Sequence, residues 1–127
     1  MNNSEKVKQF MTVFNQTVLS KPEFPSEATR ELRIKLIEEE VCELIEADAY
    51  KDIVEVADAL TDILYVVYGM AHAYGIPIDD CFNEVHRSNM SKLGTDGSPV
   101  YREDGKVIKG PNYFKPDIKS VLHSVST

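Results

Sequence analysis

The stretch IVEVADALTDILYVVYGMAHAY, residues 53–74, decides the fold class of this 127-residue chain. It is apolar on almost every side, which is typical of a helix buried among other helices. Gly75 and Pro77 follow it, and a glycine after a helix with a proline just beyond is the usual sign that one helix ends and the next begins. The sequence therefore predicts a buried helix from about Asp52 to Tyr74.

Further helices are predicted on both sides of this stretch. Before it, residues 26–50 carry apolar side chains at helical spacing, and Ser26 is the expected cap. Residues 21–25 contain two prolines, which cannot continue a helix, so a separate first helix is predicted over about residues 4–19, with its first residue as the cap. A fourth helix is expected over about residues 78–92.

The character of the chain changes after the fourth predicted helix. Residues 94–116 hold four glycines and three prolines, and Glu103-Asp104-Gly105 lies between two short β-prone runs, which predicts a short β-hairpin. The remainder is expected to be an ordered tail that frays at its end. The fold prediction is a single all-α domain over residues 1–127, a bundle of four to five helices completed by oligomerisation. Its helical core spans residues 4–93, and its hairpin and tail span residues 94–127.

Composition excludes several classes of function. The net charge of −7 argues against binding to a nucleic-acid polymer or an anionic membrane, although carboxylates can hold the metal ions that accompany phosphate substrates. No apolar run reaches the roughly 18 residues that span a bilayer, and residues 1–9 are too polar for a signal peptide. Cys42 and Cys81 lack metal-ligand spacing, so we expect two reduced thiols and a cytoplasmic location.

Acidic residues occur where the second predicted helix should be apolar. At about 100° per residue, Glu40 falls between Leu36 and Leu44, inside the apolar arc of the helix. Glu43 lies at the edge of that arc, and Glu39 lies just beyond it. The run of acids in this helix therefore has members that face inward, or nearly so.

The third predicted helix carries its own acidic strip. Glu55, Asp58 and Asp62 are spaced by three and four residues, which places them on one strip about 60° wide. Such a strip is ordinarily a solvated face, but a solvated face mixes signs, and no Lys or Arg occurs between Lys51 and Arg87. Buried carboxylates without partners raise their pKa values or destabilise the fold, and a bound cation removes both problems. Clustered oxygen ligands without His or Cys suit Mg²⁺, with Mn²⁺ as a substitute.

Polar residues near the end of the chain allow two interpretations. Asn89 and Lys92 continue the apolar stripe of the fourth helix, so this helix either extends beyond the core into water or ends at a polar site. Lys106, Lys109 and Tyr113 lie among glycines and prolines, where lysines are ordinarily solubilising. With an acidic site nearby, the same residues could contact phosphate.

The acidic segments resemble those of a known superfamily. Glu39-Glu40-Val41-Cys42-Glu43, followed by Glu55-Val56-Ala57-Asp58, resembles the paired Glu-Glu-x-x-Glu and Glu-x-x-Asp motifs of the all-α NTP pyrophosphohydrolases. This superfamily includes MazG proteins, phosphoribosyl-ATP pyrophosphohydrolases and dimeric dUTPases. The resemblance is nearest to the MazG-like branch that is itself similar to phosphoribosyl-ATP pyrophosphohydrolase, and it covers about residues 5–118. Three further segments are similar to later parts of that branch, namely residues 58–69, 84–92 and 105–113.

The resemblance implies an activity and a set of site residues. It implies Mg²⁺-dependent cleavage between the α- and β-phosphates of a nucleotide, which gives a monophosphate and pyrophosphate, by a dimer or a dimer of dimers. The implied metal ligands are Glu40, Glu43, Glu55 and Asp58. Glu39 becomes the catalytic candidate that orients or deprotonates a water molecule at the metal. The implied substrate-binding residues are Arg33, Asp62, Asn89, Lys92, Lys106, Lys109 and Tyr113, where Asp62 supports either the metal site or the sugar, and Arg33 supports either the metal ligands or a phosphate.

Other classes of function stay open at this point. Di-iron four-helix proteins use Glu-x-x-His pairs, and His72, His86 and His123 are not placed in that way. A non-catalytic nucleotide-binding protein would carry the same acidic residues without turnover. Within the enzyme class, a phosphoribosyl-ATP pyrophosphohydrolase or dUTPase-like activity is the alternative, since no residue separates the possible bases. The apolar surface of the third helix also predicts a homo-oligomer, because one partner helix cannot cover it.

Overall fold

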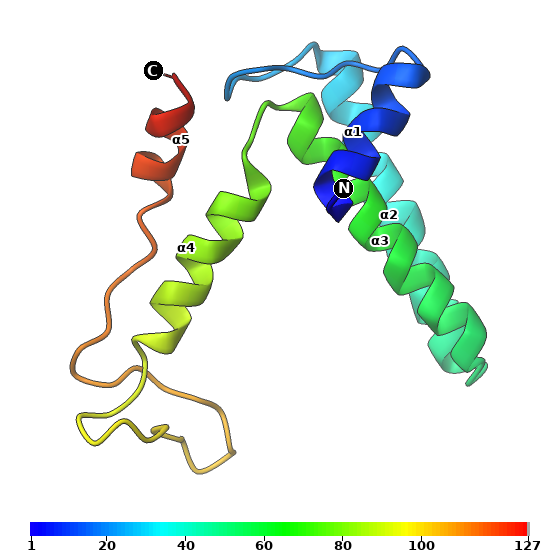
Figure 1. The fold of residues 1–127 in the computed structure, drawn as a ribbon. Helices are drawn as coiled ribbons and strands as arrows, with labels where there is room; N and C mark the ends of the chain where they lie inside the picture. Colours follow the sequence, from blue (N-terminus) through cyan, green and yellow to red (C-terminus); the bar gives the residue numbers. More distant parts are fainter. Residues whose placement is uncertain (127) are drawn as a thin grey trace. The chain divides into compact units, whose positions relative to one another are not determined.

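The computed structural model of this chain describes residues 1–126, with side chains as far as Ser124. The described residues form helices and no named strand, which confirms the all-α prediction (Figure 1). The helices are α1 (Asn3–Val13), α2 (Glu27–Ala49), α3 (Ile53–Ala73), α4 (Ile78–Met90) and α5 (Ile118–Ser126). The chain divides into two compact units, Met1–Ile78 and Asp79–Thr127, and each is described by itself. Thr127, the end of the predicted tail, lies outside the described residues.

In the first unit, α2 and α3 lie side by side and antiparallel, joined by a three-residue turn (Figure 1). The turn is tight, as the sequence predicts, because Lys51 takes up a left-handed conformation with φ 54°. The amides of Lys51 and Asp52 then donate to the carbonyls of Asp48 and Ala47, which closes the end of α2. Asp52, the next residue, caps α3 by accepting a hydrogen bond from the amide of Glu55.

Helix α1 is shorter than predicted and begins at a different cap. Asn2, rather than Ser4, forms the N-cap, and it makes a capping box with Glu5. The helix ends at Val13 instead of near residue 19, because Asn15 adopts φ 58° and the amide of Gln16 donates to Met11 O at 2.8 Å. The apolar periodicity continues past this point because Val18 packs on the core from a non-helical segment.

The segment between α1 and α2 closes the end of α3. The amides of Leu19 and Glu23 donate to the carbonyls of His72 and Tyr74, each at 3.0 Å. Gly75, which ends α3 as predicted, has φ 66°, and a side chain there would overlap the carbonyl of Lys21. The buried core of this unit lies at the same end of α3, and its residues are Val7, Met11, Ala73 and Tyr74.

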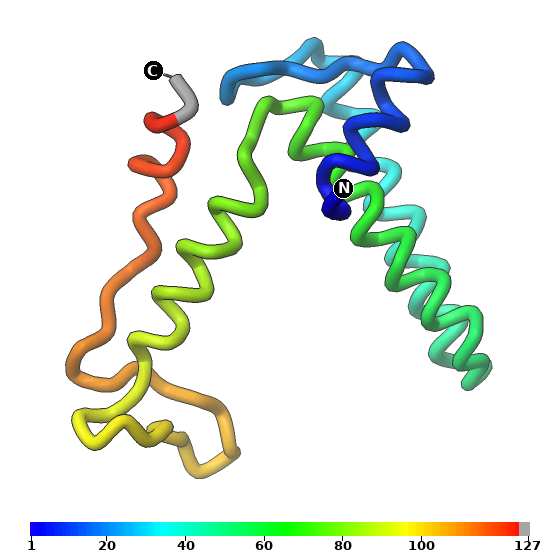
Figure 2. Tube along the Cα trace, viewed as in Figure 1, coloured from blue at the N-terminus to red at the C-terminus, as the bar shows by residue number. Residues whose placement is uncertain are grey.

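In the second unit, the chain runs through α4, turns, and comes back beside α4 to reach α5, as the trace in Figure 2 shows. Ser88 Oγ donates to Phe114 O at 2.8 Å, and the amide of Asp117 donates to Glu84 Oε2 at 2.6 Å. Helix α4 ends at Met90, two residues before the predicted end. The predicted β-hairpin is reduced to one antiparallel bridge, Tyr101–Val107. A two-stranded ribbon without a third strand or a helix to cover it is marginal, which explains the short pairing.

None of the described helices combines the length and the apolar composition that crossing a membrane requires.

Candidate metal centre

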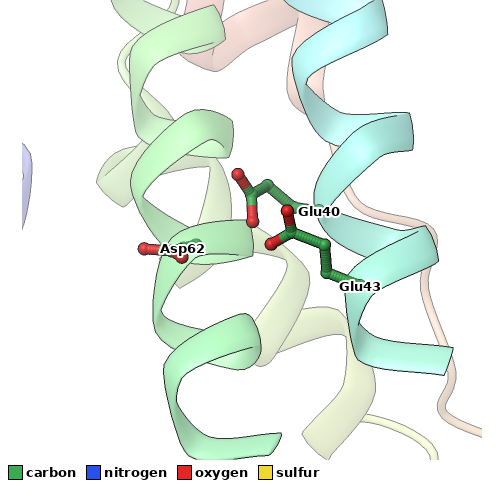
Figure 3. Close-up of side chains that lie close together, drawn as sticks. All are labelled: Glu40, Glu43 and Asp62. Atoms are coloured by element: carbon green, nitrogen blue, oxygen red, sulfur yellow. The ribbon is translucent and has the colours of Figure 1, made fainter. Parts of the chain in front are cut away.

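Three carboxylates from the neighbouring helices α2 and α3 lie close together. Glu40 and Glu43 lie on α2, one turn apart, and reach toward α3, which carries Asp62 (Figure 3). One carboxylate oxygen of each residue lies within 4.8 Å of the others. We call Glu40, Glu43 and Asp62 the carboxylate trio. It unites two of the predicted metal ligands with Asp62, for which the sequence left open a role at the metal or at the sugar.

The trio is electrostatically unfavourable without a cation. Burial raises the pKa of Glu40, and a hydrogen bond with Glu43 and the charges of Glu43, Asp62 and Asp58 raise it further. Burial also raises the pKa of Asp62, with smaller contributions from the charges of Asp58 and Glu43. The ion pairs in the described part of the chain, Arg87–Glu84 and Arg102–Asp104, lie in the second unit and involve no member of the trio.

One atom of the trio is buried and without a partner. Glu40 Oε2 is withdrawn from solvent and has no hydrogen-bond partner. A buried carboxylate oxygen in this state is costly, because it has lost its water and gained nothing in return. The donor set consists of carboxylate oxygens, without His or Cys, and so fits a hard divalent cation such as Mg²⁺ or Mn²⁺.

The other predicted acidic site residues lie on the same two helices. Asp58 is close enough to Glu40 and Asp62 for its charge to raise the pKa of both. Glu55 and Glu43 line an open hollow beside the α2–α3 turn, together with Glu46, Ala47, Tyr50 and Asp52. Glu39 is exposed on α2 and outside the trio. The metal role of Glu55 and Asp58 and the catalytic role of Glu39 stay predictions.

Arg33 is buried on α2, where the sequence offered a role beside the metal ligands or at a phosphate. The residue is 6% exposed, and its Nη2 donates to Gln16 Oε1 at 3.0 Å. Burial lowers the pKa of its guanidinium. Nothing in the sequence indicated Gln16 as its partner. Gly69 lies against the same guanidinium, and the signal for that contact was a lone glycine within an apolar stretch of α3.

The remaining predicted substrate contacts belong to the second unit. Lys109 Nζ lies 4.7 Å from the ring centroid of Tyr113, so these two predicted contacts are neighbours. Lys92 is half-buried, and its carbonyl accepts a hydrogen bond from the amide of Gly110 at 2.8 Å. Asn89 and Lys106 are exposed. Their role in substrate binding stays a prediction.

An all-α chain with clustered carboxylates on a helical hairpin has the features of the all-α NTP pyrophosphohydrolases. Comparison with known families agrees, because residues 7–89 match the profile of the phosphoribosyl-ATP pyrophosphohydrolase family. The chain belongs to this family, which confirms the resemblance drawn from the acidic motifs. Membership supports a pyrophosphohydrolase-type function.

Two individual proteins illustrate the similarity. The chain is 34% identical over 137 residues to the uncharacterized protein L479 of Acanthamoeba polyphaga mimivirus. That match covers 98% of this chain but 51% of the viral protein, so the chain spans about half the length of this relative. The fold is similar to the crystal structure of a provisionally assigned NTP pyrophosphohydrolase from Exiguobacterium sp. 255-15, with a TM-score of 0.53 and 24% identity. That match covers 99% of this chain and 94% of the other.

The raised pKa of Glu40 predicts how the stability of the metal-free protein depends on pH. Because the folded state binds this proton more tightly than the unfolded state, the contribution of Glu40 is fully present below the ordinary carboxyl pKa and is lost as pH rises through the raised pKa. In the presence of a chelator, we expect the Tm of the wild type to fall as the pH rises above the ordinary carboxyl pKa. Glu40→Gln should weaken this pH dependence and raise the Tm near neutral pH. Calorimetry from about pH 5 to pH 8 measures both effects.

The matched control is Glu38→Gln, an identical change at an exposed position of the same helix, which should leave the slope as in the wild type. Parallel Tm curves for the wild type and Glu40→Gln would show that Glu40 is not strained in the folded state.

Proposed function

We propose that this chain is a Mg²⁺-dependent nucleotide pyrophosphohydrolase that converts a nucleoside triphosphate, or a related nucleotide, into the monophosphate and pyrophosphate. The observation that carries the proposal is the carboxylate trio, with its buried and unpartnered Glu40 oxygen, in a member of the phosphoribosyl-ATP pyrophosphohydrolase family. Mn²⁺ is the expected substitute, because it accepts the same oxygen ligands.

The proposed division of labour follows from the positions of the acids. Glu40, Glu43 and Asp62 would hold the cation, with Asp58 and Glu55 on the adjacent turns of α3. When bound, the cation would lower the pKa of a water molecule that it binds, and it would offset the negative charge of the phosphates. Glu39, on α2 and exposed, is placed beside Glu40 in sequence, so it is the candidate to orient or deprotonate the attacking water.

Lysines are proposed to contact the phosphates, either from the same subunit or from a neighbouring one. A triphosphate carries more negative charge than the acidic first unit can accommodate with a cation alone, so lysines are expected to contribute. The proposed substrate contacts are Asn89, Lys92, Lys106, Lys109 and Tyr113. If Lys109 contacts a phosphate, Lys109→Ala raises the KM for the nucleotide more than it changes kcat.

The identity of the substrate is tested by a turnover panel. The purified chain is incubated with Mg²⁺ and with canonical deoxynucleotides and ribonucleotides, dUTP and phosphoribosyl-ATP, and the products are separated. Release of pyrophosphate and a monophosphate supports the proposal, and the preferred base or sugar distinguishes a general house-cleaning enzyme from a dUTPase-like or phosphoribosyl-ATP-specific one. Binding without turnover of any member would indicate a nucleotide-binding protein instead.

Loss of a trio or neighbouring carboxylate should remove activity. Replacing a group that only supports a metal ligand lowers activity or metal affinity by about 10- to 100-fold. Because Glu40 and Asp58 are proposed to lie at the metal itself, Glu40→Gln or Asp58→Asn should lower the rate by more than about 100-fold. Steady-state assays at saturating Mg²⁺ measure this loss. Glu38→Gln keeps the wild-type rate if the effect belongs to the site and not to the charge of α2, whereas wild-type rates in Glu40→Gln and Asp58→Asn would remove the basis of the metal-site assignment.

The proposed role of Glu39 can be tested separately from metal binding. Glu39→Gln keeps the size of the side chain but removes its basic oxygen, so kcat should fall by about 10²-fold or more if Glu39 acts on water. Titration calorimetry should find the affinity for Mg²⁺ close to that of the wild type. A collapse of metal affinity in this variant would make Glu39 a ligand and not a base.

Self-association is proposed from apolar side chains that the single chain leaves exposed. Val41 and Ile45 follow one another by one turn on α2, and Leu60 and Leu64 do so on α3. Their exposed fractions range from 38% for Val41 to 63% for Ile45, and such contiguous apolar faces ordinarily mark an interface. We expect a dimer or a tetramer in sedimentation equilibrium at micromolar concentration. A monomer under these conditions would contradict this part of the proposal.

A further inference from the structure

The buried guanidinium of Arg33 has no charged partner among the described residues. Arg33 as a whole residue is 6% exposed, its Nε atom is buried without a hydrogen-bond partner, and its neutral partner is Gln16, whose Oε1 accepts from Nη2. Arginine is almost never buried in this way unless it is paired, because desolvating a charge is unfavourable. An unfavourable group in this position suggests a purpose other than stability.

The guanidinium lies against bare backbone of the opposite helix. A Cβ added to Gly69 would lie 2.6 Å from Arg33 Nη1 and 3.9 Å from Met11 Sδ. Any larger residue at position 69 would therefore displace Arg33. Because glycine within a helix is destabilising relative to alanine, we expect the close approach of Arg33 to Gly69 to serve a role other than helix stability. Arg33 thus joins α2 to α3 at Gly69 and, through Gln16, to the segment that follows α1.

This contact and the carboxylate trio are in register. Glu40 follows Arg33 by seven residues in α2 (40 − 33 = 7), and Gly69 follows Asp62 by seven residues in α3 (69 − 62 = 7). Seven residues are about two helical turns, or about 10.5 Å. In an antiparallel pair, the Arg33–Gly69 contact and the approach of Glu40 to Asp62 therefore lie on one seam, two turns apart. A displacement of one helix along the other would change both together.

We propose that Arg33 is a positioning residue that, with Gly69 and Gln16, fixes the register of α2 against α3 and thereby brings Glu40 and Glu43 to Asp62. The inference rests on the proposed metal function of the trio. Arginine suits this role because its planar guanidinium holds its donors in a fixed arrangement, unlike the flexible ammonium of lysine. Arg33 acts through helix position, and it touches neither the trio nor the cation.

Binding of Mn²⁺ to the full chain, without nucleotide, tests the proposal. Arg33→Met keeps the apolar stem and removes the donors, and Gly69→Ala displaces the guanidinium. Each should weaken Mn²⁺ binding by about tenfold or more, the range for groups that position metal ligands, in electron paramagnetic resonance or calorimetry well below the Tm. Arg33→Lys should recover part of the affinity, because its ammonium can still donate to Gln16.

The control is Val7→Ala, which opens the buried core beside α3 but leaves the Arg33–Gly69 contact in place. It should lower the Tm and leave the Mn²⁺ affinity of the folded protein unchanged, which separates positioning from stability. In the double variant, Gly69→Ala should add little to Arg33→Met, since the group that the new methyl displaces is already gone.

The outcomes distinguish this inference from the proposed function. Wild-type protein that binds no Mn²⁺ would overturn both. Wild-type binding with equal affinity in Arg33→Met and Gly69→Ala would overturn the positioning role alone. If those variants bind Mn²⁺ normally and only the KM for a nucleotide rises, Arg33 contacts substrate and the proposal is wrong. Fully additive effects in the double variant would also contradict the coupling of Arg33 to Gly69.

Discussion

The antiparallel pairing of α2 with α3 is the constraint on which the candidate site depends. Neither helix can gather the trio alone, because Glu40 and Glu43 come from α2 and Asp62 comes from α3. The left-handed residue Lys51 holds one end of the pair in a three-residue turn. Toward the other end, Arg33 lies on Gly69, and the segment after α1 donates hydrogen bonds to the last carbonyls of α3. The carboxylates lie between these two fixed points, so their approach is imposed by the pair as a whole.

The same arrangement separates the part of the unit that supplies stability from the part that lowers it. The buried core of Val7, Met11, Ala73 and Tyr74 gathers at the C-terminal end of α3, where α1 also packs. The trio lies more than seven residues from that end of α3, where burial and like charges raise the pKa values of Glu40 and Asp62. Carboxylates forced together in this way are unfavourable in the metal-free protein, and a stable core elsewhere allows the chain to tolerate them. A cation would convert that strain into affinity, since it stabilises the state in which the carboxylates are already together.

Local signals in the sequence predicted most of the helical hairpin. Ser26, Asp52 and Gly75 identify the ends of α2 and α3, because caps and left-handed residues act through neighbouring atoms. The inward position of Glu40 also followed from the 3.6-residue period. Contacts between distant segments were not predictable: a helical period places Arg33 on a face but does not name Gln16 or Gly69 as its neighbours. For the same reason, α1 was predicted too long, since Val18 keeps the period of the helix while packing from a loop.

The family match covers the acidic residues proposed for the metal and for catalysis, but not most of the substrate contacts proposed in the second unit. Residues 7–89 contain every acidic residue proposed to bind the metal or to take part in catalysis, together with Arg33 and Gly69. Lys92, Lys106, Lys109 and Tyr113 lie beyond the matched region. Chemistry that relies on a cation and clustered carboxylates is indifferent to the base, because the cation engages only the phosphates. Discrimination among nucleotides needs other groups, which reach the base or the sugar.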